Sequence, residues 1–217
     1  MRLGNGAAIV PRRFFRLTGA IMPTRRFVLA AGLAAMALTA CQSTPPRPAP
    51  RPIDFSNFGP IVLNAGSIDV VDARRPAAGT SAEQRVPVPP AEAVRRWTGE
   101  RLQAAGGPGR VRVTIRDASI AEVQLPKTGG VKGYFTNDQA QRYDGRIEVE
   151  VSGEVPGETT FRGMTKAVVT QSTTVPENIS LADREATLQD LVRRMMDDLN
   201  ARLDAGIRKD LAPMVRR

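Results

Sequence analysis

The residue types that most enzymes use for nucleophilic or metal chemistry are sparse in this sequence. Its 217 residues include no histidine and a single cysteine, Cys41. The lack of histidine excludes His-based triads, His metal sites and His proton shuttles, and a single cysteine excludes an internal disulfide and a Cys-cluster zinc site. Serines are present, but neither a Gly-x-Ser-x-Gly elbow nor a Ser-x-x-Lys motif occurs. The sequence therefore predicts a protein that is not an enzyme and carries no metal or cofactor.

Carboxylates are the remaining groups that could perform acid–base chemistry. Four of them lie close together in the sequence: Asp138, Asp144, Glu148 and Glu150. Arg142 and Arg146 are interleaved with them, so pairing of opposite charges on a solvated face is the default expectation. A metal site built from Asp and Glu alone stays open. A hydrolase that uses carboxylates alone stays open as a third hypothesis, and it would need two carboxylates about 5–10 Å apart in a cleft.

The segment 125–146, LPKTGGVKGYFTNDQAQRYDGR, has the composition of a loop. Its glycines and lysines do not form the Gly-x-x-x-x-Gly-Lys-Ser/Thr pattern of a phosphate-binding loop, so we interpret the segment as the tip of a β-hairpin. Tyr134 and Phe135 are the aromatic residues of this tip. They are candidates for a partner-binding loop, and the alternative is that they fold back to cap the open end of the domain.

Residues 22–41, MPTRRFVLAAGLAAMALTAC, have the pattern of a secretory signal peptide. Arg25 and Arg26 precede an apolar stretch that ends at Leu38 and is too short to span a membrane. Met22 opens a complete signal by itself, so we predict that the true start lies there. The arginine pair also resembles a twin-arginine export signal, and the general secretory route stays open beside it.

The last residues of this leader resemble the lipobox of bacterial lipoproteins; they are Leu38, Thr39, Ala40 and Cys41. The resemblance implies that residues 1–40 are removed and that Cys41 becomes a lipidated N-terminus, carrying fatty acyl chains such as palmitate. Two or more chains anchor a protein stably to a membrane, whereas one chain binds marginally. Gln42 and Ser43 follow in place of an acidic residue. By the sorting rules of that family, this implies the periplasmic face of the outer membrane in a Gram-negative envelope.

Residues 41–60 are predicted to form the lipidated cysteine and a proline-rich tether. Prolines stand at positions 45, 46, 48, 50, 52 and 60. Because proline fixes φ and removes a backbone donor, this density favours an extended spacer over a helix or a strand. A proline-rich ligand for a partner domain is the alternative. A single periplasmic domain is then predicted over residues 61–217.

The charge of the chain does not support a nucleic-acid partner. The net charge is +9, from 31 basic and 22 acidic residues, but residues 1–40 hold six arginines and no acidic residue. Removing these six leaves 25 basic against 22 acidic residues, a net charge of +3. No clustered basic stripe remains to release counterions from a nucleic acid. No apolar run of 18 residues follows residue 40, which excludes a polytopic membrane protein.

Hydrophobic alternation predicts four strands after the tether. They are expected at residues 61–72, at 110–116 with a continuation to 125 after a bend, at 147–151, and at 161–175. Arginines alternate with apolar residues in the second strand, and Glu148 and Glu150 do so in the third. If these two strands are neighbours, their arginine and glutamate rows are expected to pair across the polar face.

Two helices complete the predicted domain. One is expected over residues 91–105, with Trp97 as its core anchor and Gly106 as its stop. The other begins after Ser180, with Asp183 in the position of a capping box, and carries a continuous apolar stripe. The order β-α-β-β-β-α predicts an α+β two-layer sandwich, in which two helices cover a four-stranded, mainly antiparallel sheet.

In the order of its elements, the domain resembles the auxiliary lipoproteins of ABC-type transport systems and the small lipoprotein of the lipopolysaccharide-assembly complex. The segments LNAGSIDVVD, PAEAVRRW, FTNDQAQRYDGR and VPENISLADREATLQDL resemble an uncharacterised group of Gram-negative lipoproteins. Together with the lipobox and the tether, this favours a non-enzymatic, lipid-anchored envelope protein. We expect it to attach to the membrane through Cys41 and to bind another envelope component, as an accessory to lipid or lipopolysaccharide transport. The alternative is a periplasmic module that binds a small ligand or the cell wall.

Overall fold

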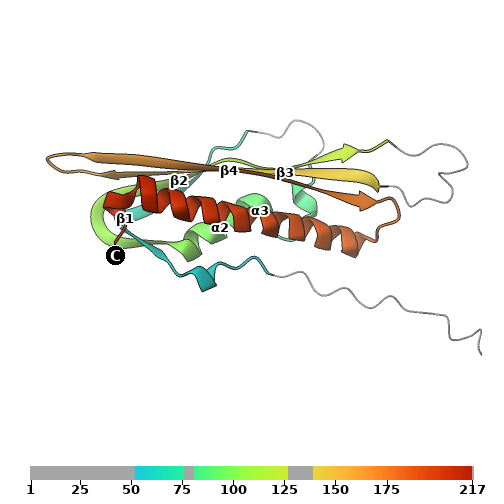
Figure 1. The fold of residues 1–217 in the computed structure, drawn as a ribbon, viewed down its shortest axis with the longest axis horizontal. Helices are drawn as coiled ribbons and strands as arrows, with labels where there is room; N and C mark the ends of the chain where they lie inside the picture. The colour runs from blue at the N-terminus through green and yellow to red at the C-terminus, as the bar shows by residue number, and fades with distance from the viewer. Residues whose placement is uncertain (1–51, 76–80, 127–138, 217) are drawn as a thin grey trace, which may run out of the picture. The chain divides into compact units, whose positions relative to one another are not determined.

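The computed structural model describes residues 52–75, 81–126 and 139–216. The main elements, in chain order, are strand β1 (Ile61–Asp72), helix α2 (Pro90–Arg101), strands β2 (Leu102–Gln124), β3 (Gln139–Val155) and β4 (Phe161–Pro176), and helix α3 (Leu181–Asp210). The described part also contains three short 3₁₀ turns, which are η2 (Ser56–Phe58), η3 (Glu83–Arg85) and η5 (Ala212–Met214). The strands form one sheet, with both helices packed on it (Figure 1). The predicted α+β class is confirmed.

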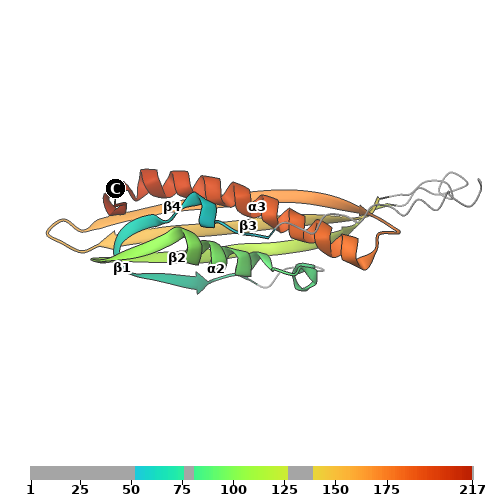
Figure 2. The same cartoon turned by 90° about the horizontal axis from the view of Figure 1, so that it is seen from below.

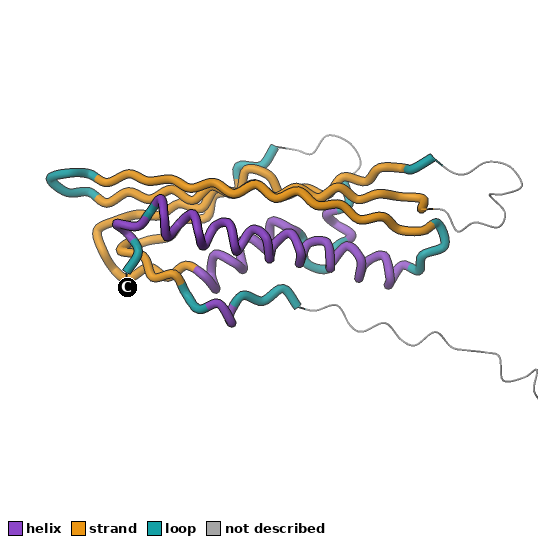
Figure 3. The backbone as a smooth tube through the Cα atoms, in the orientation of Figure 1, coloured by secondary structure: helices purple, strands orange, loops and turns teal. Residues whose placement is uncertain are grey.

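The strands lie side by side in the order β1-β2-β3-β4. β1 runs parallel to β2, with α2 as the crossover between them, whereas β3 is antiparallel to both of its neighbours. The sheet is therefore mainly antiparallel, as predicted. Both helices lie against the same face of the sheet (Figures 2 and 3). The opposite face carries no helix of the described residues, and we call it the bare face.

Alternation along the strands sends one set of apolar side chains toward the helices. Val113 and Ile115 of β2 are fully buried, as are their register partners Val151 and Val149 of β3. The apolar stripe of α3 packs on this face, and its buried apolar members are Leu188, Leu191, Val192, Met195, Met196, Leu199, Leu203 and Ile207. Fully burying one such side chain stabilises a fold by about 1.5–3 kcal/mol. The layer between helices and sheet is therefore the main source of stability.

Helices α2 and α3 are joined by a buried polar network. Trp97 is fully buried, and its Nε1–H donates to Asn200 Oδ1 at 2.9 Å. Arg101 is 1% exposed; its Nε donates to the same oxygen at 3.0 Å, and its Nη2 donates to Asp204 Oδ1 at 2.5 Å. Loss of one partner from such a network leaves a buried charge unpaired, which is strongly destabilising. The network therefore fixes the position of one helix against the other.

The segment before β1 is fastened to α2 by successive contacts. In chain order they are Arg96 Nη1 to the Ile53 carbonyl (3.4 Å), the Phe55 N–H to Glu100 Oε2 (2.8 Å), and Arg101 Nη1 to the Phe58 carbonyl (2.9 Å). The side chains of Ile53 and Phe55 are buried in the core. Core side chains thus begin within the range 41–60 that the proline content assigns to the tether.

Helix α2 ends earlier than the sequence predicts. Leu102 is extended (φ −109°, ψ 126°), and its side chain is buried, so the chain enters β2 before it reaches the glycines. The prediction of a helix up to Ala105 is therefore wrong. Gly106 lies inside β2 with φ +80°, and Gly107 passes so close to β1 that a Cβ there would clash with Asn64. Gly106 thus serves a left-handed backbone conformation and Gly107 a close approach of two strands, and neither stops a helix.

Strand β3 begins at Gln139, well before the predicted range 147–151, because it pairs with the far end of β2. Gln124 is the register partner of Gln141, so the two strands form a long hairpin. The residues that connect them, 127–138, lie outside the described residues. The bend predicted in β2 is a β-bulge between Ile115 and Asp117.

The helix start predicted after Ser180 is confirmed, with Ser180 as the N-cap. Ser180 Oγ accepts from the Asp183 N–H at 3.1 Å and donates to the Asp183 carboxylate at 2.7 Å. The helix then runs through Gly206, where a Cβ would clash with Thr165 of β4. Glycine at this position lets α3 pack directly on the sheet.

The C-terminal segment adds to the free edge of β1. Val215 forms an antiparallel bridge with Leu63, and the Arg216 N–H donates to the Val62 carbonyl at 2.8 Å. These contacts satisfy backbone groups that the first half of an edge strand would otherwise leave open. The C-terminal end of the described chain is thus tied to the beginning of β1.

Candidate functional site

Side chains on the bare face form rows across the strands, because residues paired in register point to the same side of a sheet. In the middle of this face, six charged side chains neutralise one another, and we call them the neutral half: Arg116, Asp117, Arg146, Glu148, Glu150 and Lys166. The ion pairs are Arg116–Glu150 (3.2 Å), Arg146–Asp117 (3.2 Å), Arg146–Glu148 (2.6 Å) and Lys166–Glu148 (2.5 Å). Three cations meet three carboxylates, so the neutral half carries no net charge.

Glu148 is the centre of the neutral half. Its carboxylate accepts from Lys166 and Arg146, and its side chain is 17% exposed. The hydrogen bond from Lys166, followed by that from Arg146, holds the pKa of the Glu148 carboxyl below its ordinary value of 4.5. A carboxyl group with a lowered pKa stays ionised at neutral pH and is a poor general acid. The contacts are those of structural ion pairs, as the interleaved arginines predict.

Toward the β3–β4 turn, the bare face is hollowed into a shallow groove of about 660 Å³, which we call the arginine groove. Side chains of all four strands line it: Asp69 of β1, Arg110 and Arg112 of β2, Ser152 and Glu154 of β3, and Arg162 and Met164 of β4. Two register rows cross the groove, Arg110–Glu154–Arg162 and Asp69–Arg112–Ser152–Met164. The groove is therefore built from alternate residues of regular strands, whose backbones are held rigidly by the ladder.

Arg110 and Arg112 differ from the other arginines of the bare face. Both side chains are exposed, and neither guanidinium makes an ion pair or a hydrogen bond to the described residues. Arg162, by contrast, lies 3.2 Å from Glu154. Asp69, the register partner of Arg112, also makes no ion pair within the described part. Arg162 and Glu154 neutralise each other. The remaining charges of the groove are those of Arg110, Arg112 and Asp69, which give a net charge of +1.

Glycines of β3 and β4 form the floor of the arginine groove, directly above the end of the helix layer. A Cβ on Gly153 would lie 2.8 Å from Leu211 Cδ2 and would clash with Met214. A Cβ on Gly163 would lie 2.7 Å from the Asp210 carbonyl oxygen. The absence of side chains lets the end of α3 and η5 touch the sheet backbone. The groove is therefore supported from below by the C-terminal part of the chain.

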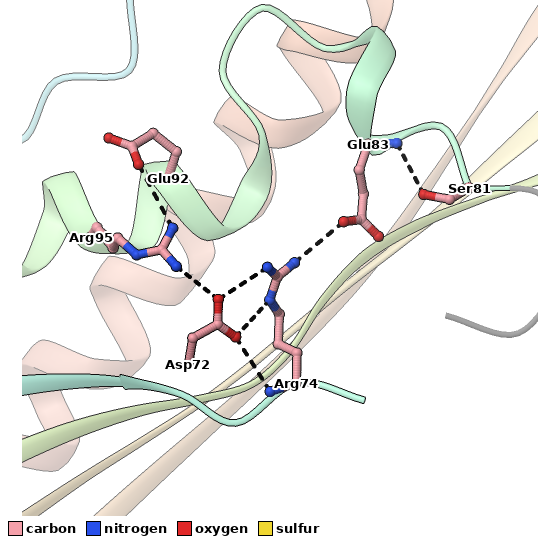
Figure 4. A network of polar contacts seen from close by, with 6 residues as sticks. All are labelled: Asp72, Arg74, Ser81, Glu83, Glu92 and Arg95. Carbon is pink, nitrogen blue, oxygen red and sulfur yellow. Dashed lines mark hydrogen bonds and ion pairs between the residues drawn. The ribbon is translucent and has the colours of Figure 1, made fainter. Parts of the chain in front are cut away.

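A second polar cluster ties the end of β1 to the crossover connection and to α2 (Figure 4). Asp72 accepts from the Arg74 guanidinium at 2.9 and 3.0 Å and from Arg95 of α2 at 2.7 Å. Arg74 also donates to Glu83 at 3.3 Å, and Arg95 lies 3.7 Å from Glu92. The hydrogen bond from Arg74 is the main cause that lowers the pKa of Asp72 from its ordinary value. Every charged group in this cluster has a partner, which indicates a structural role.

Most of the site residues predicted from the sequence lie outside the described residues. These are the lipobox residues Leu38, Thr39 and Ala40, the lipid-attachment residue Cys41, the loop aromatics Tyr134 and Phe135, and Asp138. Of the other carboxylates considered for acid–base chemistry, Asp144 pairs with Arg142 at 2.9 Å, and Glu148 and Glu150 belong to the neutral half. The arginine groove is not among the predicted sites. Its signal was the alternating arginines of residues 110–116, whose partners depend on strand register.

Within the described part of the chain, neither a metal-ligand cluster nor a membrane-spanning helix is found. His, Cys, Asp and Glu side chains there do not gather in groups of three or more that would hold a metal ion. None of its helices is long and apolar enough to cross a membrane. The groups that stand out among the described residues are the charged side chains of the bare face.

No known protein-family pattern matches this chain, and no curated protein matches it. Among solved structures, it is similar to the rare lipoprotein B from Shewanella oneidensis, with 12% identity, 63% of this chain and 94% of that chain covered, and a TM-score of 0.31. It is also similar to a minor lipoprotein from Acinetobacter baumannii, with 11% identity, coverages of 73% and 98%, and a TM-score of 0.30. Protein XCC0632 from Xanthomonas campestris has 10% identity, coverages of 73% and 95%, and a TM-score of 0.26. With likenesses this distant, the function of the chain has to be inferred from its own residues.

Proposed function

We propose that the protein is a lipid-anchored envelope protein that acts by binding another envelope component and not by catalysis. The observation that carries the proposal is the uneven charge of the bare face. Arg110 and Arg112 have no partner among the described residues and lie in the arginine groove. In the neutral half, which is next to it, each charged side chain has a partner of opposite charge. A hollow with an excess of one sign of charge, here a net +1, attracts and orients a partner of the opposite sign. This arrangement supports a recognition surface.

The proposed anchor is Cys41, at the periplasmic face of the outer membrane. Its support is the resemblance of residues 38–41 to a lipobox and the neutral Gln42 that follows. Among the described residues, the first buried side chain is that of Ile53, so we take residues 42–52 as the free part of the proposed tether. A polyproline-like spacer extends by about 3.1 Å per residue, so this segment reaches about 35 Å. Ile53 would then lie within that distance of the membrane.

A non-enzymatic role is supported by the state of the carboxylates on the bare face. General acids need a pKa raised toward neutral pH, usually by burial or by a second carboxylate. The pKa of Glu148 is instead lowered by Lys166 and Arg146. Asp144 and Glu150 each lie beside an arginine, at 2.9 and 3.2 Å. These carboxylates are used for ion pairing, which supports binding over hydrolysis.

As the finer form of the proposal, the protein is an accessory of lipid or lipopolysaccharide transport across the envelope. The alternative function is a module that binds a small ligand or the cell wall. The arginine groove supports the binding of a small ligand, because its volume of about 660 Å³ falls within the range of about 300–1,000 Å³ that is usual for ligand pockets. The two functions differ in whether a protein partner contacts the bare face.

Site-specific crosslinking in living cells tests the proposal. A photoreactive amino acid is placed at Thr170, which is exposed on the bare face, and in a second strain at Asp197, which is exposed on α3. We expect crosslinks to transporter or assembly proteins from Thr170 and none from Asp197. A Cys41→Ser version, which should lose its anchor, is expected to lose both membrane attachment and the crosslinks.

Each result of the crosslinking separates the candidates. Crosslinks from Asp197 alone would contradict the use of the bare face. Retention of membrane attachment in Cys41→Ser would contradict the anchor. Absence of any protein crosslink from Thr170, with Cys41 still needed for attachment, would favour the ligand- or wall-binding alternative over the transport accessory.

A further inference from the structure

We infer that the arginine groove binds a phosphate monoester through Arg110 and Arg112. The inference rests on the proposed function, because it names the class of ligand that the bare face recognises. Three observations carry it. The face is hollowed at this place, the two guanidiniums have no partner among the described residues, and each cation of the neutral half has one.

The two guanidiniums are placed to share a single anion. Arg110 and Arg112 are two residues apart in β2, so their side chains leave the same face about 6.5–7 Å apart. Each presents a planar fork of donors on a long stem, which lets both forks converge on one group. A phosphate monoester carries a charge of about −1.5 to −2 and three free oxygens, so it can accept from two forks at once. A carboxylate, with one charge and two oxygens, satisfies a single fork.

The row beyond these arginines indicates what the phosphate is attached to. Across the sheet from Arg112 lie Ser152 and then Met164. The Ser152 hydroxyl donates to the Arg112 carbonyl at 3.5 Å, a long hydrogen bond, and it can turn to donate to a hydroxyl or ester oxygen of a phosphorylated polyol. Met164 is 55% exposed and offers an adaptable apolar contact beyond it. A phosphorylated polyol with an apolar extension matches this order. A glycerophosphate headgroup of a lipid and a soluble sugar phosphate share this chemistry.

Removal of the Asp69 charge should change the phosphate affinity in the opposite direction to removal of an arginine charge. Its exposed carboxylate lies in register with Arg112 at the border of the groove. A negative charge there repels an anion held by Arg112, so the affinity of the groove is lower than the arginines alone would give. Removing the charge of Asp69 should strengthen phosphate binding, whereas removing the charge of either arginine should weaken it.

Calorimetric titration of the full chain, purified in dodecyl maltoside, tests the inference. One titrant is glucose 1-phosphate, and the other is dodecyl maltoside micelles that contain phosphatidic acid. Glucose and micelles that contain phosphatidylcholine, which has no phosphate monoester, serve as controls. We expect saturable binding of at least one monoester and of neither control. Binding of neither monoester would overturn the inference.

Matched variants then locate the site. Arg110→Gln and Arg112→Gln each remove one charged fork and are expected to weaken binding about tenfold or more. Arg116→Gln is the control, since it removes the same charge from the same strand and face but from an arginine paired with Glu150. It should change the affinity by less than about twofold in 0.15 M salt. Asp69→Asn should strengthen binding about two- to fivefold. Equal losses in the three arginine variants would show a general charge effect and overturn the assignment.

Comparison of the two monoesters separates the sources of the phosphate. Tighter binding of phosphatidic acid, weakened by Met164→Ser, assigns a lipid headgroup to the groove. Equal affinity for the two, with no effect of Met164→Ser, assigns a soluble sugar phosphate. These titrations use purified protein alone, so their failure removes the ligand class and leaves the crosslinking result intact. Loss of crosslinks with intact phosphate binding does the reverse.

Discussion

The neutral half and the arginine groove use the same strands and the same residue types, yet they present different surfaces. In the neutral half, the β-bulge of β2 brings Arg116 and Asp117 to the bare face together, where each meets an opposite charge. In the groove, β2 is regular, and the register partner of Arg112 on β3 is Ser152. Alternation of residue types places an arginine on a face, but register alone does not neutralise it. Arg110 has Glu154 as its register partner on β3, and that carboxylate pairs with Arg162 instead.

The largest expected effect on stability comes from adding a side chain to a glycine beneath the arginine groove. Gly153→Val would push a side chain into Leu211 and Met214, and we expect the free energy of unfolding to fall by about 2–3 kcal/mol. Urea denaturation measures this. The control is Gly157→Val in the β3–β4 turn, where a Cβ would lie 3.9 Å from the Thr159 carbonyl oxygen, in ordinary van der Waals contact. A control that costs as much as Gly153→Val would show that close packing under the groove is not the cause.

A smaller effect is expected from removing the centre of the neutral half. Glu148→Ala leaves Lys166 and Arg146 close together without the carboxylate that both contact. Because both cations are almost half exposed, solvent screens them, and we expect a loss of about 1 kcal/mol in the free energy of unfolding. Glu154→Ala in the groove removes a contact to Arg162, which is 76% exposed, and should cost less than about 0.5 kcal/mol. Equal losses of unfolding free energy in the two variants would contradict an energetic difference between the neutral half and the arginine groove.

The contribution of Glu148 should disappear in acid. Its pKa is lowered in the folded protein, so the unfolded chain takes up a proton at this group more readily. The stabilisation is therefore fully present above the ordinary pKa of 4.5 and is lost as the pH falls through the lower pKa of the folded state. Denaturant unfolding of the wild type and of Glu148→Gln, measured from pH 7 to pH 3, should give curves that converge below pH 4.5. Curves that stay parallel would contradict the ionic origin.

The smallest change in stability is expected when the groove is made to resemble the neutral half. Ser152→Glu places a carboxylate opposite Arg112 in register, as Glu150 lies beside Arg116. The free energy of unfolding should stay within about 0.5 kcal/mol, while phosphate binding is lost. Ser172→Glu adds the same charge to the same face on β4, away from the groove, and should leave binding intact. Binding that survives Ser152→Glu would place the anion elsewhere.

The elements of this fold were accessible from the sequence where local patterns dominate. The strand at residues 61–72 agrees with β1, and α3 begins after its N-cap Ser180 as predicted. The helix predicted up to Ala105 ends at Arg101, because burial of Leu102 outweighs the local helix pattern. Tertiary packing decided that boundary, and it could not be read from the neighbouring residues alone.

Only part of the candidate site could be predicted from the sequence, again because contacts between distant residues decide the rest. The sequence showed arginines and glutamates alternating in two strands, and it predicted that their rows would pair. Arg116 does pair with Glu150, but Arg110 and Arg112 do not find a carboxylate. The difference depends on the bulge before Asp117 and on which arginine each carboxylate contacts, since Glu154, the register partner of Arg110, pairs with Arg162. Neither is determined by residue periodicity, so the groove emerges only when the strands are aligned.

The contacts between α2 and the segment before β1 give the domain a defined path for mechanical tension. A pull on the chain from its N-terminal side meets the bonds of Arg96 and Glu100 to the backbone of residues 53 and 55. It then meets the bond from Arg101 to the Phe58 carbonyl before it reaches β1. Because Arg101 is also bonded to Asp204, the load passes into α3, the longest helix described. These hydrogen bonds would therefore have to break before the force reaches the strands that carry the arginine groove.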